Sequence, residues 1–280
     1  KRDVRPRVGH IQFINCFPLY YGLIQNRVLL DMELRKGTPK ELNQMLADNL
    51  LDLAPIPSIE YARHFRELVL LPDISVSCDG EVMSIVLVSK VPIERLDGRR
   101  VALTNTSATS QVLLRILLAR RYKAAPEYFV SPPRLGSMLM EADAALLIGD
   151  EALRAHYELR GQANVYDLGR EWKDWTGQAM VFAVWAVRRE YWQRFPQQVL
   201  AVKRALTESM HLSLQNLPDV AAKAAEWEVF SPEYLQQYFT SLRFDFDRRQ
   251  QEGLLTYYRE AVNIGALDEV PALEFVGDTP

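Results

Sequence analysis

Short apolar segments typical of β-strands alternate with helical patterns along the first two thirds of the chain. The helical patterns come from apolar residues at helical spacing, as at Leu42, Met45, Leu46 and Leu50. Strands that alternate with helices are typical of βαβ units and parallel pairing. The sequence therefore predicts an α/β protein with mostly parallel sheets. The expected strands are residues 8–15, 32–37, 51–56, 68–71, 74–77, 82–89, 100–103, 128–130, 144–148, 165–168 and 180–187.

The chain is long enough for two hydrophobic cores. It has 280 residues, whereas single domains usually hold ~100–200. The apolar segment 180–187 is expected to return the chain to its first core, and the residues after it are mainly helical. We therefore expect two lobes around a central cleft. Lobe 1 is discontinuous and comprises residues 1–89 and 181–280, and lobe 2, residues 90–180, is inserted into it.

Charge and composition exclude several classes of protein. The net charge is −3 and no basic stripe is present, which argues against a nucleic-acid partner. No apolar run approaches the ~20 residues that span a bilayer, so no membrane partner is expected. Cys16 and Cys78 form no CxxC motif, and the first residues carry no hydrophobic signal core. These features predict a cytoplasmic protein, and they leave its oligomeric state open.

The motifs of cofactor and metal enzymes are missing from the sequence. It contains no GxGxxG, Walker or GxSxG pattern. The four histidines lack the spacing of zinc ligands, and we expect each of them to be structural. We therefore predict no cofactor and no metal, and a small organic ligand held by local donors. The histidines are His10, His64, His156 and His211.

A turn rich in hydroxyl groups is the strongest single signal for a ligand. It covers residues 104–110 and joins a predicted strand to a predicted helix. Ligands of open α/β sheets bind beyond the carboxyl ends of strands, where helix N-termini attract anions. One hydroxyl would suffice to cap the helix, and five favour an anion site. The five are Thr104, Thr106, Ser107, Thr109 and Ser110.

Other polar residues follow strands in the same way, and each has a purely structural alternative. Asn15 could shape the turn before Pro18, and Ser58 could cap a helix after a proline. Gly149 ends a strand, and for Asp150 we favour a helix cap over a role at a site.

Ser84 lies on an expected crossing strand, where a polar side chain either faces solvent or lines the cleft. The tryptophans Trp172 and Trp175 could form the edge of a lid. We favour packing within a helix for both.

These segments, taken in order, resemble the chorismate dehydratase family of the futalosine route to menaquinone. The resemblance covers about residues 8–190. Where family members often have Tyr-Leu-Asn-Thr, this chain has Phe13-Ile14-Asn15-Cys16, which keeps the asparagine. The matching segments are VGHIQFINCFPL (8–19), LAPIPSIEY (53–61), VMSI (82–85), LTNTSATS (103–110), ALLIGDEAL (145–153), WKDWTG (172–177) and MVFA (180–183).

The resemblance implies the type II periplasmic-binding-protein fold, used as an enzyme without a cofactor. The implied reaction removes water from the dianion chorismate and gives 3-[(1-carboxyvinyl)oxy]benzoate. Asn15 would act at the reacting centre. The base would be the enolpyruvyl carboxylate of the substrate itself or Asp150. The residues expected to bind substrate are Ser58, Ser84, Asn105, Ser107, Thr109, Ser110 and Gly149.

Three other functions fit a two-lobed fold. A solute-binding protein for a small aromatic or dicarboxylic acid has the same architecture, because fold does not fix function. The dihydroxynaphthoate synthase of the same pathway is disfavoured, because its first turn resembles Ser-Pro-Cys-Pro-Asn-Asp-Thr-Phe. A regulatory effector-binding domain ranks last, since no helix-turn-helix precedes residue 8.

Overall fold

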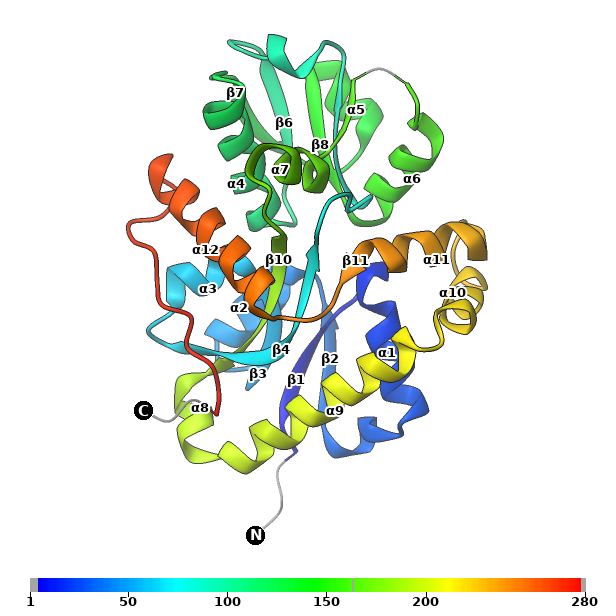
Figure 1. The fold of residues 1–280 in the computed structure, drawn as a ribbon, viewed down its shortest axis with the longest axis vertical. Helices are drawn as coiled ribbons and strands as arrows, with labels where there is room; N and C mark the ends of the chain where they lie inside the picture. The colour runs from blue at the N-terminus through cyan, green and yellow to red at the C-terminus, as the bar shows by residue number, and fades with distance from the viewer. Residues whose placement is uncertain (1–4, 163, 278–280) are drawn as a thin grey trace.

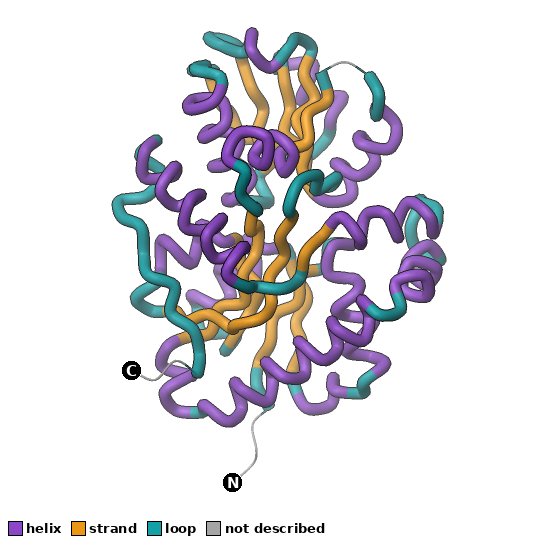
Figure 2. Tube along the Cα trace, viewed as in Figure 1, coloured by secondary structure: helices purple, strands orange, loops and turns teal. Residues whose placement is uncertain are grey.

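The computed structural model describes residues 5–162 and 164–277, which form two lobes, each built on its own sheet (Figure 1). Helices flank both sheets (Figure 2). The predicted α/β class and the two-lobed architecture are confirmed. Among the described residues, no helix is long and apolar enough to cross a membrane.

The sheet of the first lobe has six strands in the order β11-β4-β10-β3-β1-β2. The strand β1 pairs in parallel with β2 and β3, whereas β10 runs antiparallel to β3 and β4. The central strands β3 and β10 are almost wholly buried, as expected for strands covered on both faces. The strands are β1 (Arg7–Ile11), β2 (Glu33–Gly37), β3 (Leu53–Pro57), β4 (Leu68–Cys78), β10 (Met180–Arg188) and β11 (Leu242–Arg243).

The sheet of the second lobe has five strands in the order β7-β6-β8-β5-β9. The strand β6 is parallel to β7 and β8, and β5 is antiparallel to β8 and β9. Both sheets are therefore mixed, which corrects the expectation of mostly parallel pairing. The strands are β5 (Ile85–Ser89), β6 (Arg100–Thr104), β7 (Glu127–Ser131), β8 (Ala144–Ile148) and β9 (Val165–Asp167).

Several helices begin where capping residues and prolines predict. Thr38 and Glu41 form the expected capping box, with Pro39 in the first turn. The first lobe carries α1 (Phe17–Gln25), α2 (Pro39–Ala47), α3 (Ser58–His64), α8 (Arg189–Arg194), α9 (Pro196–Leu214), α10 (Leu217–Ala225), α11 (Pro232–Ser241) and α12 (Arg248–Asn263). The second carries α4 (Ala108–Ile116), α5 (Leu135–Glu141), α6 (Gly149–Leu159) and α7 (Leu168–Thr176).

Two local predictions are wrong. The first strand ends at Ile11, and Asn15 lies in the 3-10 turn Ile14–Cys16 that precedes α1. Ser84 is not on a strand, because an irregular segment separates β4 from β5. Helix packing of Trp172 is confirmed: the residue is fully buried and its indole N–H donates to the Ala179 carbonyl at 3.1 Å.

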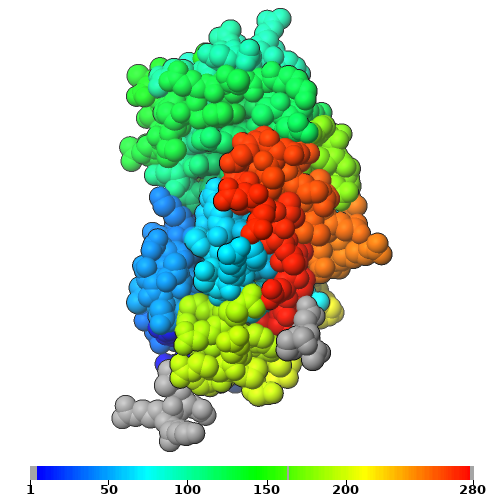
Figure 3. All heavy atoms as spheres, turned by 90° about the vertical axis from the view of Figure 1, so that its left-hand side faces the viewer, coloured from blue at the N-terminus to red at the C-terminus, as the bar shows by residue number. Residues whose placement is uncertain are grey.

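The C-terminal helices pack on the first lobe, and α12 also reaches the second. Helix α9 lies against α1 and β4, and α12 contacts both β10 and α4. In Figure 3 the red and orange C-terminal segment runs up the side of the molecule to the green second lobe. The C-terminal helices therefore contact residues of both lobes.

Candidate active site between the lobes

A narrow cavity lies between the two lobes, at the carboxyl ends of β1 and β3. It brings together five of the predicted residues: Asn15, Ser84, Ser107, Ser110 and Gly149. The remaining lining comes mainly from apolar side chains of both lobes. These are Ile11, Phe13, Pro39, Pro57, Ile85, Ile148, Phe182, Ala183 and Tyr238.

Asn15 carries an unpaired polar atom in this cavity. Its side-chain oxygen Oδ1 is buried and has no hydrogen-bond partner among the described residues. An unsatisfied buried acceptor costs about 1–3 kcal/mol, so such groups are expected where a ligand supplies the missing partner. Asn15 lies within the short 3-10 turn Ile14–Cys16, and this turn places its side chain in the lining of the cleft.

Ser107 and Ser110 place the N-terminus of α4 at the cleft. Ser107 is the N-cap, and its hydroxyl accepts the backbone N–H of Ser110 at 3.4 Å. The Ser107 hydroxyl donates in turn to Ser110 Oγ at 3.0 Å. The positive end of the helix dipole favours a bound anion here. Both serines line the cleft, and the anion site itself stays a prediction.

Ser84 and Gly149 form another part of the cleft lining. The Gly149 N–H donates to the Ser84 carbonyl at 2.9 Å, and the Tyr238 hydroxyl donates to Ser84 Oγ at 2.8 Å. Gly149 has a φ of 63°, a conformation that side chains other than glycine rarely adopt. A β-carbon there would lie 3.8 Å from the Phe13 ring of the other lobe.

Ser58 and Thr109 lie behind the cavity wall rather than on it. Both are fully buried. The Ser58 hydroxyl donates to the Val181 carbonyl at 2.7 Å, and Thr109 Oγ1 accepts the Ile59 N–H at 3.2 Å. The Ser58 bond joins α3 to β10 within the first lobe, and the Thr109 bond joins α3 to α4 of the second lobe, so Thr109 connects the lobes beside the cleft. Ser58 is the first residue of α3 and makes no cap hydrogen bond.

Asn105 lines a neighbouring hollow of about 300 Å³ together with Lys40 and Gln111. Pro57 borders both this hollow and the cleft. Asn105 is exposed, so the structure separates it from Ser107 and Ser110 of the same turn.

Asp150 lies in the first turn of α6 and is not among the side chains that line the cleft. The expected helix cap is wrong, because Ile148 occupies the N-cap position and no side chain caps the helix. Burial of the carboxyl raises the pKa of Asp150 and the charge of Glu151 adds to this, while a hydrogen bond from the Ile14 N–H opposes it. The residue as a whole is exposed.

One cluster outside the cleft has the residue types of a metal site. Glu81, His156 and Asp167 place potential ligand atoms within 4.8 Å of one another. Both His156 nitrogens are already engaged, by Glu81 at 2.9 Å and by the Tyr234 hydroxyl at 2.8 Å. Asp167 accepts backbone N–H groups, including those of Val82 and Met83. The cluster is therefore satisfied by protein groups, and we assign it a structural role.

Sequence reasoning missed the cleft residues Phe13, Phe182 and Tyr238. Phe13 could have been indicated by its place two positions before Asn15. Phe182 could have been indicated by its place on the predicted return strand, which brings the chain back to the first lobe. Tyr238 lies on a C-terminal helix far along the chain, and no local pattern marks it. Only the three-dimensional packing of α11 brings it to Ser84.

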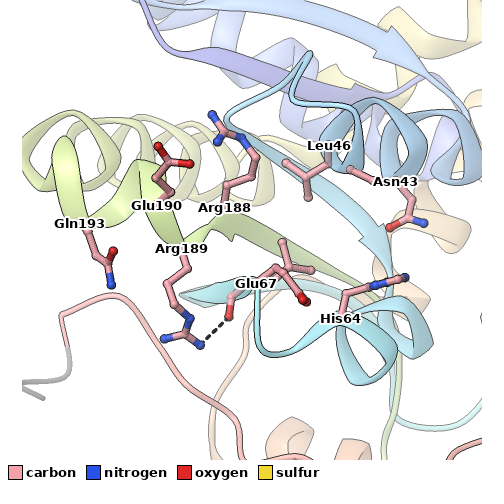
Figure 4. A pocket seen from close by; sticks show the side chains of 10 residues that line it. Asn43, Leu46, His64, Glu67, Arg188, Arg189, Glu190 and Gln193 are labelled. Atoms are coloured by element: carbon pink, nitrogen blue, oxygen red, sulfur yellow. Dashed lines mark hydrogen bonds between the residues drawn. The ribbon is translucent and has the colours of Figure 1, made fainter.

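The cleft is closed in this structure. Its free volume is about 50 Å³, whereas pockets for small ligands usually measure ~300–1,000 Å³. A hollow of about 460 Å³ lies at the other end of β10, where Asn43, His64, Glu67 and Arg188 border it (Figure 4). We place the site in the smaller cleft, because the unpaired Asn15 oxygen and the N-terminus of α4 meet there.

Two lobes, each with its own sheet, and a cleft between them define the class of periplasmic-binding-protein folds. A protein from Archaeoglobus fulgidus superposes with a TM-score of 0.77 at 19% identity, over 95% of this chain and 100% of that one. The alkanesulfonate-binding protein from Xanthomonas axonopodis, bound to MOPS, superposes with a TM-score of 0.69 at 14% identity, over 99% and 97%. These likenesses show the fold.

Sequence comparison narrows this class to one family. Residues 6–263 match the family model described as menaquinone biosynthesis. The chain is 34% identical to the chorismate dehydratase of Thermus thermophilus, over 91% of this chain and 94% of the relative. It is 28% identical to that of Campylobacter jejuni, over 69% and 75%. The chain therefore belongs to the menaquinone biosynthesis family, and within it to the chorismate dehydratases.

Proposed function

We propose that this chain is a hydro-lyase that removes water from chorismate in the cleft between its lobes. The observation that carries the proposal is the buried, unpaired Asn15 oxygen beside the N-terminus of α4. The unpaired oxygen suits the hydroxyl group of a substrate, and the helix N-terminus suits a carboxylate. The relatives named chorismate dehydratase support this choice of substrate.

The reaction breaks one C–H and one C–O bond of the chorismate ring. The C3 proton and the C4 hydroxyl leave as one water molecule, and the product is 3-[(1-carboxyvinyl)oxy]benzoate. Aromatisation of the ring supplies the driving force. The protein therefore has to position the substrate and stabilise the charge that develops on the ring carboxylate.

We assign one substrate carboxylate to Ser107, Ser110 and the N-terminus of α4. Among the described residues, no lysine or arginine lines the cleft. A carboxylate there would be held by hydroxyl and backbone N–H donors and by the helix dipole. Ser84 and Gly149 would bind the remaining polar groups of the substrate. Ser58 and Thr109 would hold α3 and α4 in place behind them.

Asn15 would bind the substrate at the reacting centre. Its amide offers an acceptor oxygen and two N–H donors, enough to accept a hydrogen bond from the ring hydroxyl and to donate one to a departing oxygen. Phe13 and Phe182 would enclose the ring and exclude water, which strengthens each electrostatic contact inside the cleft.

For the base we favour the enolpyruvyl carboxylate of the substrate over Asp150. Among the described residues that line the cleft, none is a histidine, an aspartate or a glutamate. The Asp150 carboxylate lies outside the lining. A carboxylate carried by the substrate can reach the ring proton without any protein base.

We propose that the lobes separate to admit chorismate and close over it. We propose that the two crossings are residues 79–84 and 177–179 and that the second lobe starts at residue 85 rather than 90, which the pairing of β5 in the second sheet supports. We also place the reaction in the cytoplasm, because Cys16 and Cys78 are buried free thiols.

Purified protein mixed with chorismate tests the proposal, with product followed by chromatography and ultraviolet absorbance. We expect the enolpyruvyl benzoate to form without an added metal or cofactor. A raised melting temperature with no product would point to a solute-binding protein, the function of the alkanesulfonate-binding neighbour. If no product forms and the melting temperature does not rise, chorismate is not the ligand.

A further inference from the structure

Three buried tyrosines on the C-terminal helices donate hydrogen bonds to predicted site residues of both lobes. The Tyr257 and Tyr258 hydroxyls of α12 donate to the backbone carbonyls of Thr109, at 3.0 Å, and Ser58, at 2.6 Å. The Tyr238 hydroxyl of α11 donates to Ser84 Oγ at 2.8 Å. All three tyrosines are fully buried. The C-terminal helices thus reach the site at three points.

Tyr238 differs from the other two because its partner is a side-chain atom. Ser84 lines the cleft, so the atom that Tyr238 contacts belongs to a residue that faces the ligand. A serine hydroxyl has one hydrogen and two lone pairs. When Tyr238 donates to one lone pair, the Ser84 hydrogen must point elsewhere.

The protein offers that hydrogen only a weak acceptor. The Val82 carbonyl lies 3.5 Å from Ser84 Oγ, at the limit of hydrogen-bond distance. A ligand oxygen in the cleft would be a better acceptor. Burial raises the pKa of Tyr238, and the bond to Ser84 opposes this only in part, so the phenol stays neutral and able to donate.

We infer that Tyr238 is a positioning residue, which orients the Ser84 hydroxyl so that Ser84 donates its hydrogen to a carboxylate oxygen of the substrate. This inference rests on the proposed function, since it takes chorismate as the ligand. It brings a C-terminal helix into the site, although Tyr238 itself transfers no proton.

A double-mutant cycle tests the inference through the kinetic constants for chorismate. Tyr238→Phe removes only the phenol oxygen, and Ser84→Ala removes its partner. We expect each single variant to raise KM by about 10- to 100-fold, with a smaller change in kcat, since a lost hydrogen bond to a charged group has effects of this size. The double variant should be no worse than the worse single variant, because Tyr238 acts through Ser84.

Tyr191→Phe is the matched control. Tyr191 is also buried and donates to Gln198 Oε1 at 2.6 Å, on helices away from the cleft. We expect this variant to keep the KM of the wild type. An increase similar to that of Tyr238→Phe would show a general effect of removing a buried hydroxyl, and would overturn the inference.

Further outcomes separate this inference from the proposed function. If the wild type converts chorismate but Tyr238→Phe keeps the wild-type KM, only the role of Tyr238 is overturned. Additive effects in the double variant would also overturn that role alone. If Tyr238→Phe fails to fold, an unchanged KM in Ser84→Ala would still overturn it. A wild-type protein that neither binds nor converts chorismate would contradict the function, and this inference with it.

Discussion

Asn15 ends one predicted strand and Asp150 directly follows another, yet only Asn15 lines the cleft. Asn15 enters the cleft with a buried, unpaired oxygen, while Asp150 lies in the first turn of α6, outside the cleft lining. The difference arises from the chain direction after each strand. A 3-10 turn follows β1, whereas a helix starts directly after β8.

Asp150→Asn tests which group acts as the base. Because the Asp150 carboxylate does not line the cleft, we expect kcat to stay within about 3-fold of the wild type, while a missing general base usually costs ~100-fold or more. Steady-state kinetics with chorismate measure this. A loss of that size, with chorismate binding retained in a thermal-shift assay, would make Asp150 the base.

His10 predicts how stability depends on pH. Burial, with the charge of Lys36, lowers the pKa of His10 to about 4, against about 6.5 in an unfolded chain. Between these values only the unfolded chain binds the proton, so stability falls as the pH falls. We expect a loss of about 2 kcal/mol between pH 7.5 and pH 5 from this residue.

Urea unfolding of His10→Gln and of wild-type protein at both pH values measures this contribution. The variant should lose about 2 kcal/mol less than the wild type on acidification. His211→Gln, at an exposed position, should lose as much as the wild type. An equal loss in all three proteins would show that His10 contributes nothing to the pH dependence.

At the scale of elements, the sequence predicts most strands and helices but not their pairing. Local periodicity and caps identify α2, whose capping box is as expected. The two-residue strand β11 has no local signal, and it exists because it pairs with the end of β4. The same limit applies to the site: Ser107 and Ser110 could be predicted from one turn, whereas Tyr238 depends on a contact 154 positions away in sequence.

The packing of α12 on β10 requires glycine at position 253. A β-carbon there would lie 2.1 Å from the Ala179 carbonyl oxygen, so Gly253→Ala must displace the helix. We expect a loss of about 1–3 kcal/mol in unfolding free energy. A lower kcat/KM should accompany it, because α12 carries Tyr257 and Tyr258.

Urea unfolding and chorismate kinetics of Gly253→Ala test this packing. Gly136→Ala is the matched control, since no atom lies within 4 Å of its added β-carbon. The control should be at least as stable as the wild type, because alanine favours the helix α5, and it should be equally active. A Gly253→Ala protein as stable and active as the control would show that α12 does not depend on this close approach.

For the whole molecule, polar contacts across the crossings hold the lobes together. Asp79, in the first crossing, accepts hydrogen bonds from Lys173 of α7 at 2.5 Å and from Arg249 of α12 at 2.8 Å. These ion pairs lower the pKa of the Asp79 carboxyl, with Arg249 as the main cause. Because each pair connects a lobe to the crossing, the pairs favour the closed arrangement.

Asp79→Asn should weaken closure modestly. The groups are partly exposed, and such pairs contribute up to ~1 kcal/mol each. We expect KM for chorismate to rise about 3- to 5-fold with kcat nearly unchanged, and small-angle scattering to show a larger radius of gyration without ligand. Glu226→Gln, which removes a surface pair with Lys223, should change neither. An unchanged KM in Asp79→Asn would show that these pairs do not affect closure.

The most direct test of the central claim is the turnover of chorismate by Asn15→Leu compared with the wild type. Leucine keeps the size of the side chain and removes the amide, so we expect kcat to fall by ~100-fold or more, while a thermal shift still shows chorismate binding. Asn26→Leu, at an exposed position on the first lobe, should turn over like the wild type. Full activity in Asn15→Leu would contradict the placement of the reaction in the cleft between the lobes.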